Sequence, residues 1–248
     1  PAFSPDGKEF AYLEERTTVR VMDLDKKRSR GVLPGKYNYS YSDGDQSFEW
    51  SPDGKWILAQ FFEEGGWQHP DIALVKADGK GEIHNLTNSG YSDGNARWVL
   101  GGKAIIWSTD REGMRSHGSW GAQRDVYALF LDPKAYAEFR RTKEERTLAE
   151  KLKSEREKRR EEKDSVKQAD KPAEQRFDLE DLEERMVRLT IHSSALGDAV
   201  LTHDGRKLFY LAAFEGGYDL WVRNFDDGST RLLSKLGRGG RLELSKDG

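Results

Sequence analysis

The chain has 248 residues, a formal net charge of −3 and no cysteine, and 11% of its residues are aromatic. Without cysteine it can form no disulfide, thiolate metal site or cysteine nucleophile, and its balanced charge provides no basic field that would recruit nucleic acid. No apolar run is long enough to span a bilayer, and the aromatic content, which includes seven tryptophans, indicates folded and half-buried surfaces.

A five-residue motif recurs along the chain at nearly constant spacing. Residues 3–7 read Phe-Ser-Pro-Asp-Gly, residues 50–54 read Trp-Ser-Pro-Asp-Gly, and weaker copies begin at Trp98, Leu201 and Leu244. Successive copies are 47, 48, 103 and 43 residues apart, so the longest spacing contains one repeat and an insertion. In each copy an apolar residue ends a strand. Asp-Gly, replaced by Gly-Gly in the copy that begins at Trp98, supplies the left-handed backbone of a tight hairpin.

The segments that follow each motif also repeat, in a fixed order. Second strands are predicted at 9–13, 56–60, 104–107 and 207–211, and third strands at 19–22, 71–75, 125–129 and 219–222. Fourth strands are predicted to end at 33–34, 86–87, 189–190 and 233–234. Four short strands in a unit of roughly 45 residues are typical of a β-propeller blade. The alternative, a β-sandwich, predicts no fixed order of distinct strand motifs.

These repeats predict an all-β fold, a partial β-propeller of about four four-stranded blades with a charged helical insertion. The blades are expected at about 1–45, 46–95, 96–195 and 196–240, with the start of a fifth at 241–248. Because an open arc leaves sheet edges uncovered, we expect residues 1–248 to be an incomplete propeller that continues on both sides. A closed ring of four blades is the alternative, which the extra half-motif disfavours.

The insertion spans residues 132–181 and lies between the third and fourth strands of the third blade. It begins Asp-Pro-Lys-Ala-Tyr-Ala-Glu-Phe139 and then carries Leu148 and Leu152 at helical spacing, so we expect one or two helical turns to pack on the propeller. Residues 153–163 include no apolar side chain, which predicts a solvated helix or a disordered segment. A surface excursion is the simplest interpretation, and a docking arm for a partner subunit is the functional alternative.

The connection between the second and third strands of the third blade is a candidate contact loop. It spans residues 109–124 and is rich in Gly and Arg. Its side chains could line a binding surface or a channel mouth on the face opposite the Asp-Gly turns, whereas the structural alternative is an ordered loop with Trp120 folded onto a blade. The candidate peptide or partner contacts in this loop are Arg111, Arg115, His117, Trp120 and Arg124.

Two connectors between blades add two candidates on the same face. Residues 41–44 and 91–94 both read Tyr-Ser-Asp-Gly and lead into inner strands, which places Asp43 and Asp93 at the expected pore entrance. The alternative is that these aspartates cap turns. No catalytic, cofactor-binding or metal-binding residue is identified, because the chain contains no G-x-S-x-G elbow and its histidines lack H-E-x-x-H spacing.

One stretch carries a more specific resemblance. Residues 177–190 read Phe-Asp-Leu-Glu-Asp-Leu-Glu-Glu-Arg-Met-Val-Arg-Leu-Thr, after the charged insertion and before a blade. With residues 115–121 (Arg-Ser-His-Gly-Ser-Trp-Gly) and the Ser-Pro-Asp-Gly-Lys blades, this stretch resembles the second propeller of tricorn-like serine peptidases, and the blades alone resemble TolB-type propellers. The resemblance covers nearly the whole chain, although Gly replaces Asp in the third motif at 98–102.

The resemblance implies a function by association. In that family the propellers precede a PDZ-like domain and the catalytic domains, and gate peptide entry or product exit, while no position here matches the serine nucleophile or its partners. We therefore expect a non-catalytic segment that binds or gates peptide or unfolded polypeptide for catalytic and PDZ-like domains outside this chain. The alternative is a TolB-like scaffold for protein–protein interaction.

Partners and location follow from the same resemblance. We expect no cofactor, metal, nucleic acid or membrane insertion, and association of several copies is left open. A bacterial periplasm or cell envelope is favoured over the cytoplasm, because the relatives that look most similar are exported.

Overall fold

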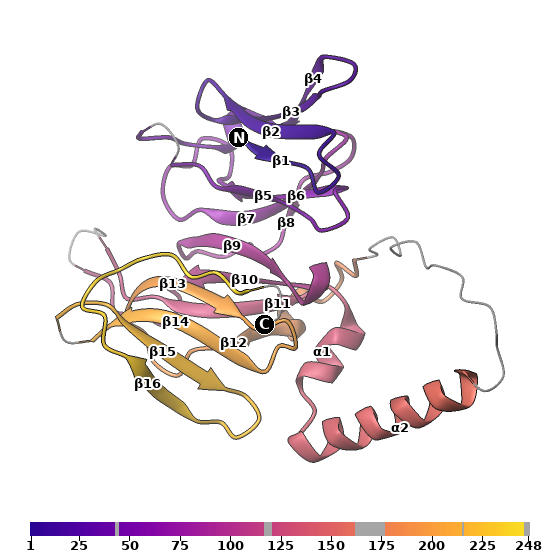
Figure 1. Ribbon diagram of the computed structural model, residues 1–248. Coiled ribbons are helices and arrows are strands. Elements are labelled where there is room, and N and C mark those ends of the chain that lie inside the picture. Colours follow the sequence, from indigo (N-terminus) through magenta and orange to yellow (C-terminus); the bar gives the residue numbers. More distant parts are fainter. Residues whose placement is uncertain (43–44, 117–120, 162–176, 215, 246–248) are drawn as a thin grey trace.

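The computed structural model describes residues 1–42, 45–116, 121–161, 177–214 and 216–245. These residues form four four-stranded antiparallel sheets, each with its strands in sequential order, and Figure 1 shows the sheets following one another as blades. Two α-helices, α1 and α2, project beside the third and fourth blades among the described residues. The predicted fold class, a partial β-propeller with a helical insertion, is confirmed.

The strands lie close to the predicted segments. Blade 1 contains β1 (Ala2–Phe3), β2 (Glu9–Glu14), β3 (Thr18–Asp23) and β4 (Arg28–Leu33). Blade 2 contains β5 (Phe48–Trp50), β6 (Trp56–Phe61), β7 (Asp71–Lys76) and β8 (His84–Asn85). Blade 3 contains β9 (Asp93–Val99), β10 (Ala104–Thr109), β11 (Asp125–Phe130) and β12 (Met186–Arg188). Blade 4 contains β13 (Ala195–Leu201), β14 (Lys207–Ala213), β15 (Asp219–Asn224) and β16 (Thr230–Ser234).

The recurring motif forms one hydrogen-bonded turn between the first and second strand of a blade. The Ser51 hydroxyl donates to the Asp53 carboxylate at 2.6 Å, and the backbone N–H of Trp56 donates to the Ser51 hydroxyl at 2.9 Å. Gly54 has a φ of +70°, a conformation that glycine adopts without strain. In the third blade a short 3₁₀ turn, Leu100–Gly102, replaces this arrangement.

The hydrophobic core lies between blades rather than within one sheet. Ile105 packs toward blade 2 and its neighbour Ile106 packs toward blade 4. In blade 2, Leu58 faces blade 3, whereas Ile57 faces blade 1. Because successive side chains of a strand point to opposite faces, a strand between two blades must be apolar at nearly every position. This requirement accounts for the continuous apolar runs of β6, β10 and β11.

The insertion forms two helices, α1 (Pro133–Phe139) and α2 (Lys143–Glu161). Asp132 caps α1, because its carboxylate accepts the backbone N–H of Lys134 at 2.9 Å. Phe139 packs against the ring of Phe130 at 4.9 Å between centroids and against Phe225 at 5.3 Å. The predicted packing of the start of the insertion on the propeller is thus observed.

The predicted packing of Leu148 and Leu152 is wrong, since these side chains are 59% and 47% exposed. Instead, Arg146 of α2 forms an ion pair with Asp226 at 2.8 Å, and both side chains are largely buried. The physical reason is that the turns of blade 4 facing α2 carry charged groups, so polar contacts hold the helix. For residues 153–163, where the sequence predicts a solvated helix or a disordered segment, α2 continues to Glu161, and residues 162–176 lie outside the described residues.

The C-terminal part of the insertion, from Phe177 onward, closes a gap between two blades. The ring of Phe177 lies between Trp56 of blade 2 and Trp98 of blade 3, at centroid distances of 5.4 and 5.6 Å. Leu179 and Leu182 pack beneath it against the same core cluster. The stretch on which the family resemblance rests therefore has a structural role as a wedge between blades 2 and 3.

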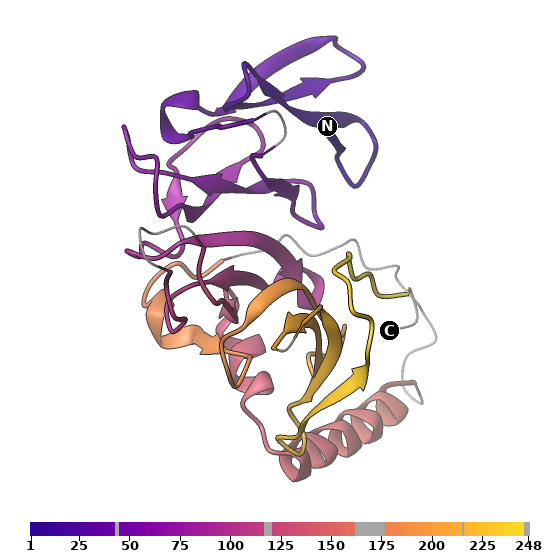
Figure 2. The ribbon, with the colours of Figure 1, turned by 90° about the vertical axis from the view of Figure 1, so that its left-hand side faces the viewer.

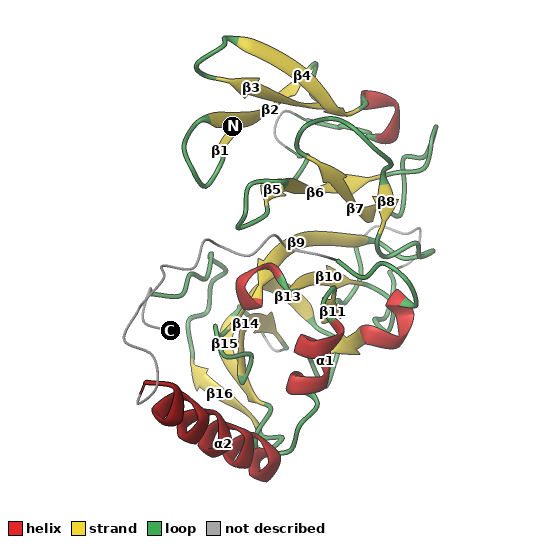
Figure 3. Cartoon of the chain, turned by 90° about the vertical axis from the view of Figure 1, so that its right-hand side faces the viewer, coloured by secondary structure: helices red, strands yellow, loops and turns green. Residues whose placement is uncertain are grey.

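The two faces of the arc carry different elements. The Asp-Gly turns, α1 and α2 lie on one side, which we call the helix face, at the right of Figure 1 and toward the viewer in Figure 3. The blade connectors and the loops between second and third strands lie on the opposite side, the connector face, toward the viewer in Figure 2. None of the described helices is long and apolar enough to cross a membrane.

Residues 241–245, predicted to begin a fifth blade, are not part of any strand. The backbone N–H of Leu242 donates to the carboxylate of Asp198 at 2.7 Å, and Asp198 also forms an ion pair with Arg97 at 2.8 Å. This part of the chain therefore contacts the inner strands β9 and β13. The residue boundaries given above for the blades stay predictions.

Candidate functional site

The connector face gathers the predicted contact residues that the structure describes. Asp43, His117 and Trp120 lie outside the described residues. Arg111, Arg115 and Arg124 come from the loop between β10 and β11. Asp93 begins β9, the inner strand of the same blade.

Asp93 is in the interior, with 1% of its surface exposed. Its carboxylate accepts hydrogen bonds from Ser89 Oγ at 2.8 Å and from the Trp107 indole N–H at 3.1 Å. Burial raises the pKa of the Asp93 carboxyl, because the charged form loses water, although these hydrogen bonds partly offset that effect. Both oxygens of the Asp93 carboxylate are thus engaged inside the protein, which favours the structural alternative of a turn-stabilising aspartate over direct contact with a partner.

Arg111 and Arg115 both contact the ring of Tyr91. Their guanidinium carbons lie 5.3 and 5.0 Å from the ring centroid, which is within the range of cation–π attraction. Arg111 also lies 5.6 Å from the ring centroid of Tyr127. Arg115 forms an ion pair with the buried carboxylate of Asp110 at 3.2 Å. We call Arg111, Tyr91 and Arg115 the arginine–tyrosine stack.

Arg124 joins the loop to the neighbouring connectors. Its backbone N–H and C=O form a pair of hydrogen bonds with Ser194, at 2.7 and 3.1 Å. Its guanidinium donates to the backbone carbonyl of Ser92 at 3.2 Å and lies 3.4 Å from the Ser108 hydroxyl. Arg124 therefore holds the connectors before and after blade 3 together, beside the arginine–tyrosine stack.

A small polar pocket opens next to this stack. Its volume is about 80 Å³, enough for several water molecules or one carboxylate group. The imidazole Nδ1 of His69 lies 3.2 Å from the Ser92 hydroxyl in its wall. The guanidinium groups make the lining rich in donors, which suits a carbonyl or carboxylate oxygen. The pocket is lined by His69, Ser92, Asp110, Arg115, Gly121, Ala122 and Arg124.

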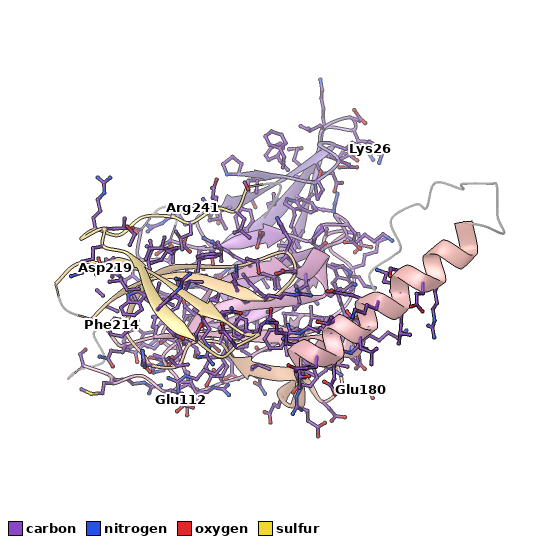
Figure 4. All side chains as sticks on the ribbon, turned by 60° about the horizontal axis from the view of Figure 1, so that its bottom comes forward. Lys26, Glu112, Glu180, Phe214, Asp219 and Arg241 are labelled. Carbon is purple, nitrogen blue, oxygen red and sulfur yellow. The ribbon has the colours of Figure 1, made fainter. Side chains whose placement is uncertain are left out.

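Large apolar side chains are exposed on loops of the same face. Trp67 and Met114, from loops of blades 2 and 3, are 51% and 76% exposed. Tyr39 and Tyr41, in the connector to blade 2, contact each other edge to face at 4.8 Å between centroids. Asp219 is the first residue of β15. Figure 4 shows Phe214 and Asp219 on the same side of the molecule, away from α2. Exposed apolar groups beside polar donors are typical of an interaction surface.

Sequence reasoning did not single out Tyr91, His69 or Asp110 as members of this site. Tyr91 precedes the Ser-Asp-Gly connector that was noted for its aspartate, and Asp110 stands within the loop that was noted for its arginines. The available signal was their position in these two loops. Their convergence depends on the blade geometry, which brings residues about 20 positions apart in the sequence into contact.

Comparisons with known proteins identify the fold. No family model and no curated protein matches the chain. TolB from Acinetobacter baumannii is 19% identical with a TM-score of 0.50, over 94% of this chain and 42% of that one. The tricorn protease is 11% identical with a TM-score of 0.58, over 94% of this chain and 22% of that one. A putative TolB from Agrobacterium tumefaciens is 15% identical with a TM-score of 0.51, over 95% and 61%.

The chain therefore spans between about a fifth and three fifths of the length of these proteins. At these identities the similarity is one of fold. The chain has the β-propeller architecture shared by TolB and by the propeller domains of peptidases.

Proposed function

We propose that this chain is a non-catalytic propeller segment of a tricorn-like serine peptidase, and that its connector face binds peptide or unfolded polypeptide for catalytic and PDZ-like domains outside the chain. The resemblance of residues 177–190 and the fold similarity to the tricorn protease support the association with a peptidase. The observation that carries the binding role is the arginine–tyrosine stack beside a donor-rich pocket, with exposed apolar side chains on the surrounding loops.

The chemistry of an extended peptide matches this surface. An extended peptide presents backbone carbonyl groups and alternating side chains. The guanidinium groups of Arg111 and Arg115 can donate hydrogen bonds to the carbonyl oxygens. Tyr91 holds both guanidinium groups in place, which reduces the entropy lost when they bind. Trp67 and Met114 expose apolar surface, and its removal from water by a bound peptide is favourable.

Hydrolysis of an unstructured polypeptide by the longest natural protein that contains this chain tests the association with a peptidase. We expect hydrolysis that a serine-directed inhibitor abolishes, and no hydrolysis by residues 1–248 alone. An inactive but folded parent protein would contradict the peptidase assignment.

Binding to the connector face is tested in the same protein with Tyr91→Ala and Arg111→Ala. We expect each variant to raise KM for the polypeptide roughly five- to tenfold, the equivalent of a lost contact of about 1 kcal/mol. The kcat for a short peptide should not change. Arg28→Ala, which removes an exposed arginine from β4 of blade 1, is the matched control. Unchanged KM in both connector-face variants would contradict this site.

A TolB-like scaffold for protein–protein interaction is the second candidate function. The observation that favours it is that the exposed apolar side chains belong to loops of several blades and thus fit a folded partner as well as a peptide. This function predicts an inactive parent protein that retains a protein partner in pull-down experiments. Loss of that partner with Trp67→Ala would then locate the interaction on the connector face.

We also propose a location in the bacterial periplasm or cell envelope, on the strength of the same resemblance. Fractionation of cells that express the natural protein tests this proposal. Recovery of the protein in the cytoplasmic fraction alone would contradict it.

A further inference from the structure

A second and larger cavity lies on the helix face, away from the site described above. Its volume is about 620 Å³, within the roughly 300–1,000 Å³ of small-ligand sites. Residues of α1 and α2 line one side of it, and residues from the turns of blades 3 and 4 line the other. Figure 3 shows the two helices and blades 3 and 4 from this face. We call this cavity the helix-face cleft.

The walls of the cleft are held by specific contacts. Phe139 packs between Phe130 and Phe225, which anchors α1 to blades 3 and 4. The ion pair of Arg146 with Asp226 fixes the first turns of α2, and Glu150 pairs with Arg206 across the cleft. These contacts fix the positions of α1 and α2 relative to the turns of blades 3 and 4.

The lining of the cleft is positively charged, although the whole chain is not. Six of its lining residues are Lys or Arg and three are Asp or Glu, a formal balance of +3. Arg146 and Arg206 are already engaged in ion pairs. The other four cations, Lys103, Arg141, Lys153 and Arg156, have no carboxylate partner within 4.0 Å among the described residues. The chain as a whole has a formal net charge of −3, so this surplus is local.

Apolar side chains accompany these cations inside the cleft. Leu100, Ala149 and Leu152 contribute to its lining, and Leu152 is 47% exposed. The ring of Phe139 is engaged with two other rings, so among the described lining residues no phenylalanine, tyrosine or tryptophan offers a free face for stacking a nucleic-acid base. The lining is thus complementary to a ligand that combines carboxylates with aliphatic side chains.

The same face already holds a segment of this composition. Residues 178–184 read Asp-Leu-Glu-Asp-Leu-Glu-Glu, and Leu179 and Leu182 of this segment pack into the core. The buried Arg185 forms an ion pair with Asp178 at 3.3 Å and donates to the backbone carbonyl of Glu180 at 2.7 Å. An acidic, leucine-containing chain is therefore a ligand class that arginines and apolar gaps on this face can accommodate.

We propose that the helix-face cleft docks an acidic, leucine-rich segment of a partner protein, whose carboxylates pair with Lys103, Arg141, Lys153 and Arg156 and whose leucines contact Leu100 and Leu152. This interaction is independent of peptide binding on the connector face. In this proposal the helical insertion forms one side of the docking site.

Fluorescence anisotropy with labelled peptides tests the proposal on the full chain. The probe is a peptide of repeated Glu-Glu-Leu, and its comparison is a Lys-Lys-Leu peptide of equal length. We expect saturable binding of the acidic probe that weakens as salt is raised, and at least tenfold weaker binding of the basic peptide. A single-stranded oligonucleotide that binds more tightly than the acidic peptide would overturn the proposal.

Charge reversal locates the binding. The double variant Arg141→Glu/Lys153→Glu should lower affinity for the acidic probe at least about tenfold, whereas Arg28→Glu, an equal change of charge on blade 1, should leave it unchanged. Leu152→Ser removes an exposed apolar contact and should weaken binding without lowering the thermal midpoint. Tyr91→Ala should have no effect, which separates this site from the connector face. Equal affinities of the charge-reversal and control variants would overturn the proposal.

Discussion

At the residue scale, a buried aspartate at the start of the third strand organises the connector in blades 2 and 3. Asp125 accepts hydrogen bonds from Thr190 Oγ1 and Ser193 Oγ, both at 2.6 Å, and forms an ion pair with Arg188 at 2.9 Å. Asp71 occupies the equivalent position in blade 2, where it accepts Thr87 Oγ1 at 2.9 Å. Asp recurs at the start of the third strand because its carboxylate accepts hydrogen bonds from the connector.

We expect Asp125→Ala to lower the free energy of unfolding by about 3 kcal/mol, because it leaves Arg188 and two hydroxyls without their acceptor. Urea unfolding measures the change. The exposed Asp25→Ala is the control and should change stability by less than about 0.5 kcal/mol. Equal effects of the two substitutions would contradict the organising role of Asp125.

A second residue-scale prediction concerns Glu49 in the inner strand of blade 2. Burial raises the pKa of its carboxyl above the ordinary value of 4.5, despite the hydrogen bond from the backbone N–H of Trp98. Folding therefore favours the protonated form. The cost of the charged form is fully present above the raised pKa and absent below the ordinary pKa.

Glu49→Gln keeps an acceptor for Trp98 and removes the charge. We expect this variant to be more stable than the natural chain near neutral pH, and the difference to disappear as the pH falls below about 4.5. Unfolding by urea over a series of pH values measures the difference. A stability difference that does not vary with pH would show that titration of Glu49 is not its source.

At the scale of elements, the C-terminal part of the insertion, which begins at Phe177, stabilises the propeller more than its charged sequence suggests. Phe177 fills the gap between Trp56 and Trp98, whereas the leucines of α2 remain exposed. The insertion is thus attached at both ends, by Phe139 at its start and by Phe177 where it returns.

We expect Phe177→Ala to lower the free energy of unfolding by about 2–3 kcal/mol, somewhat less than for a fully buried phenylalanine. Leu148→Ala, on the exposed side of α2, should cost less than about 0.5 kcal/mol. Urea unfolding of both variants makes the comparison. A larger loss from Leu148→Ala would mean that the helix packs on the propeller through its leucines.

At the scale of the molecule, stability depends on contacts between neighbouring blades. One core cluster joins blades 1 and 2, a second joins blades 2 and 3, and a third joins blades 3 and 4. Blades 1 and 4 share no cluster among the described residues. Such a linear arrangement behaves as a chain of units coupled to their nearest neighbours.

We expect Val21→Ala, which removes about 1–2 kcal/mol of packing between blades 1 and 2, to speed hydrogen exchange in β2 and β3. Exchange in β14 of blade 4 should not change. Mass spectrometry of peptides from both regions measures the effect. Uniformly faster exchange in all four blades would indicate that the arc unfolds as a single cooperative unit.

The sequence repeat alone determined the blade architecture and most strand positions of this protein. Those features are local: an Asp-Gly turn and an apolar run specify a hairpin wherever they occur. The repeat also indicated which loops share a face, because successive hairpins alternate between the two ends of a blade. This argument predicts a shared face for Arg111, Arg115 and Arg124, and the three residues belong to the loop between β10 and β11.

Only the tertiary structure decided which side chains meet. The burial of Asp93, the exposure of Leu148 and Leu152, and the stacking of Tyr91 with two arginines all depend on contacts between separate segments. A periodic pattern shows that a helix has an apolar side, but the opposing surface determines whether that side is buried. Here the opposing turns of blade 4 are charged, so ion pairs hold α2 and leave a basic cleft beside it.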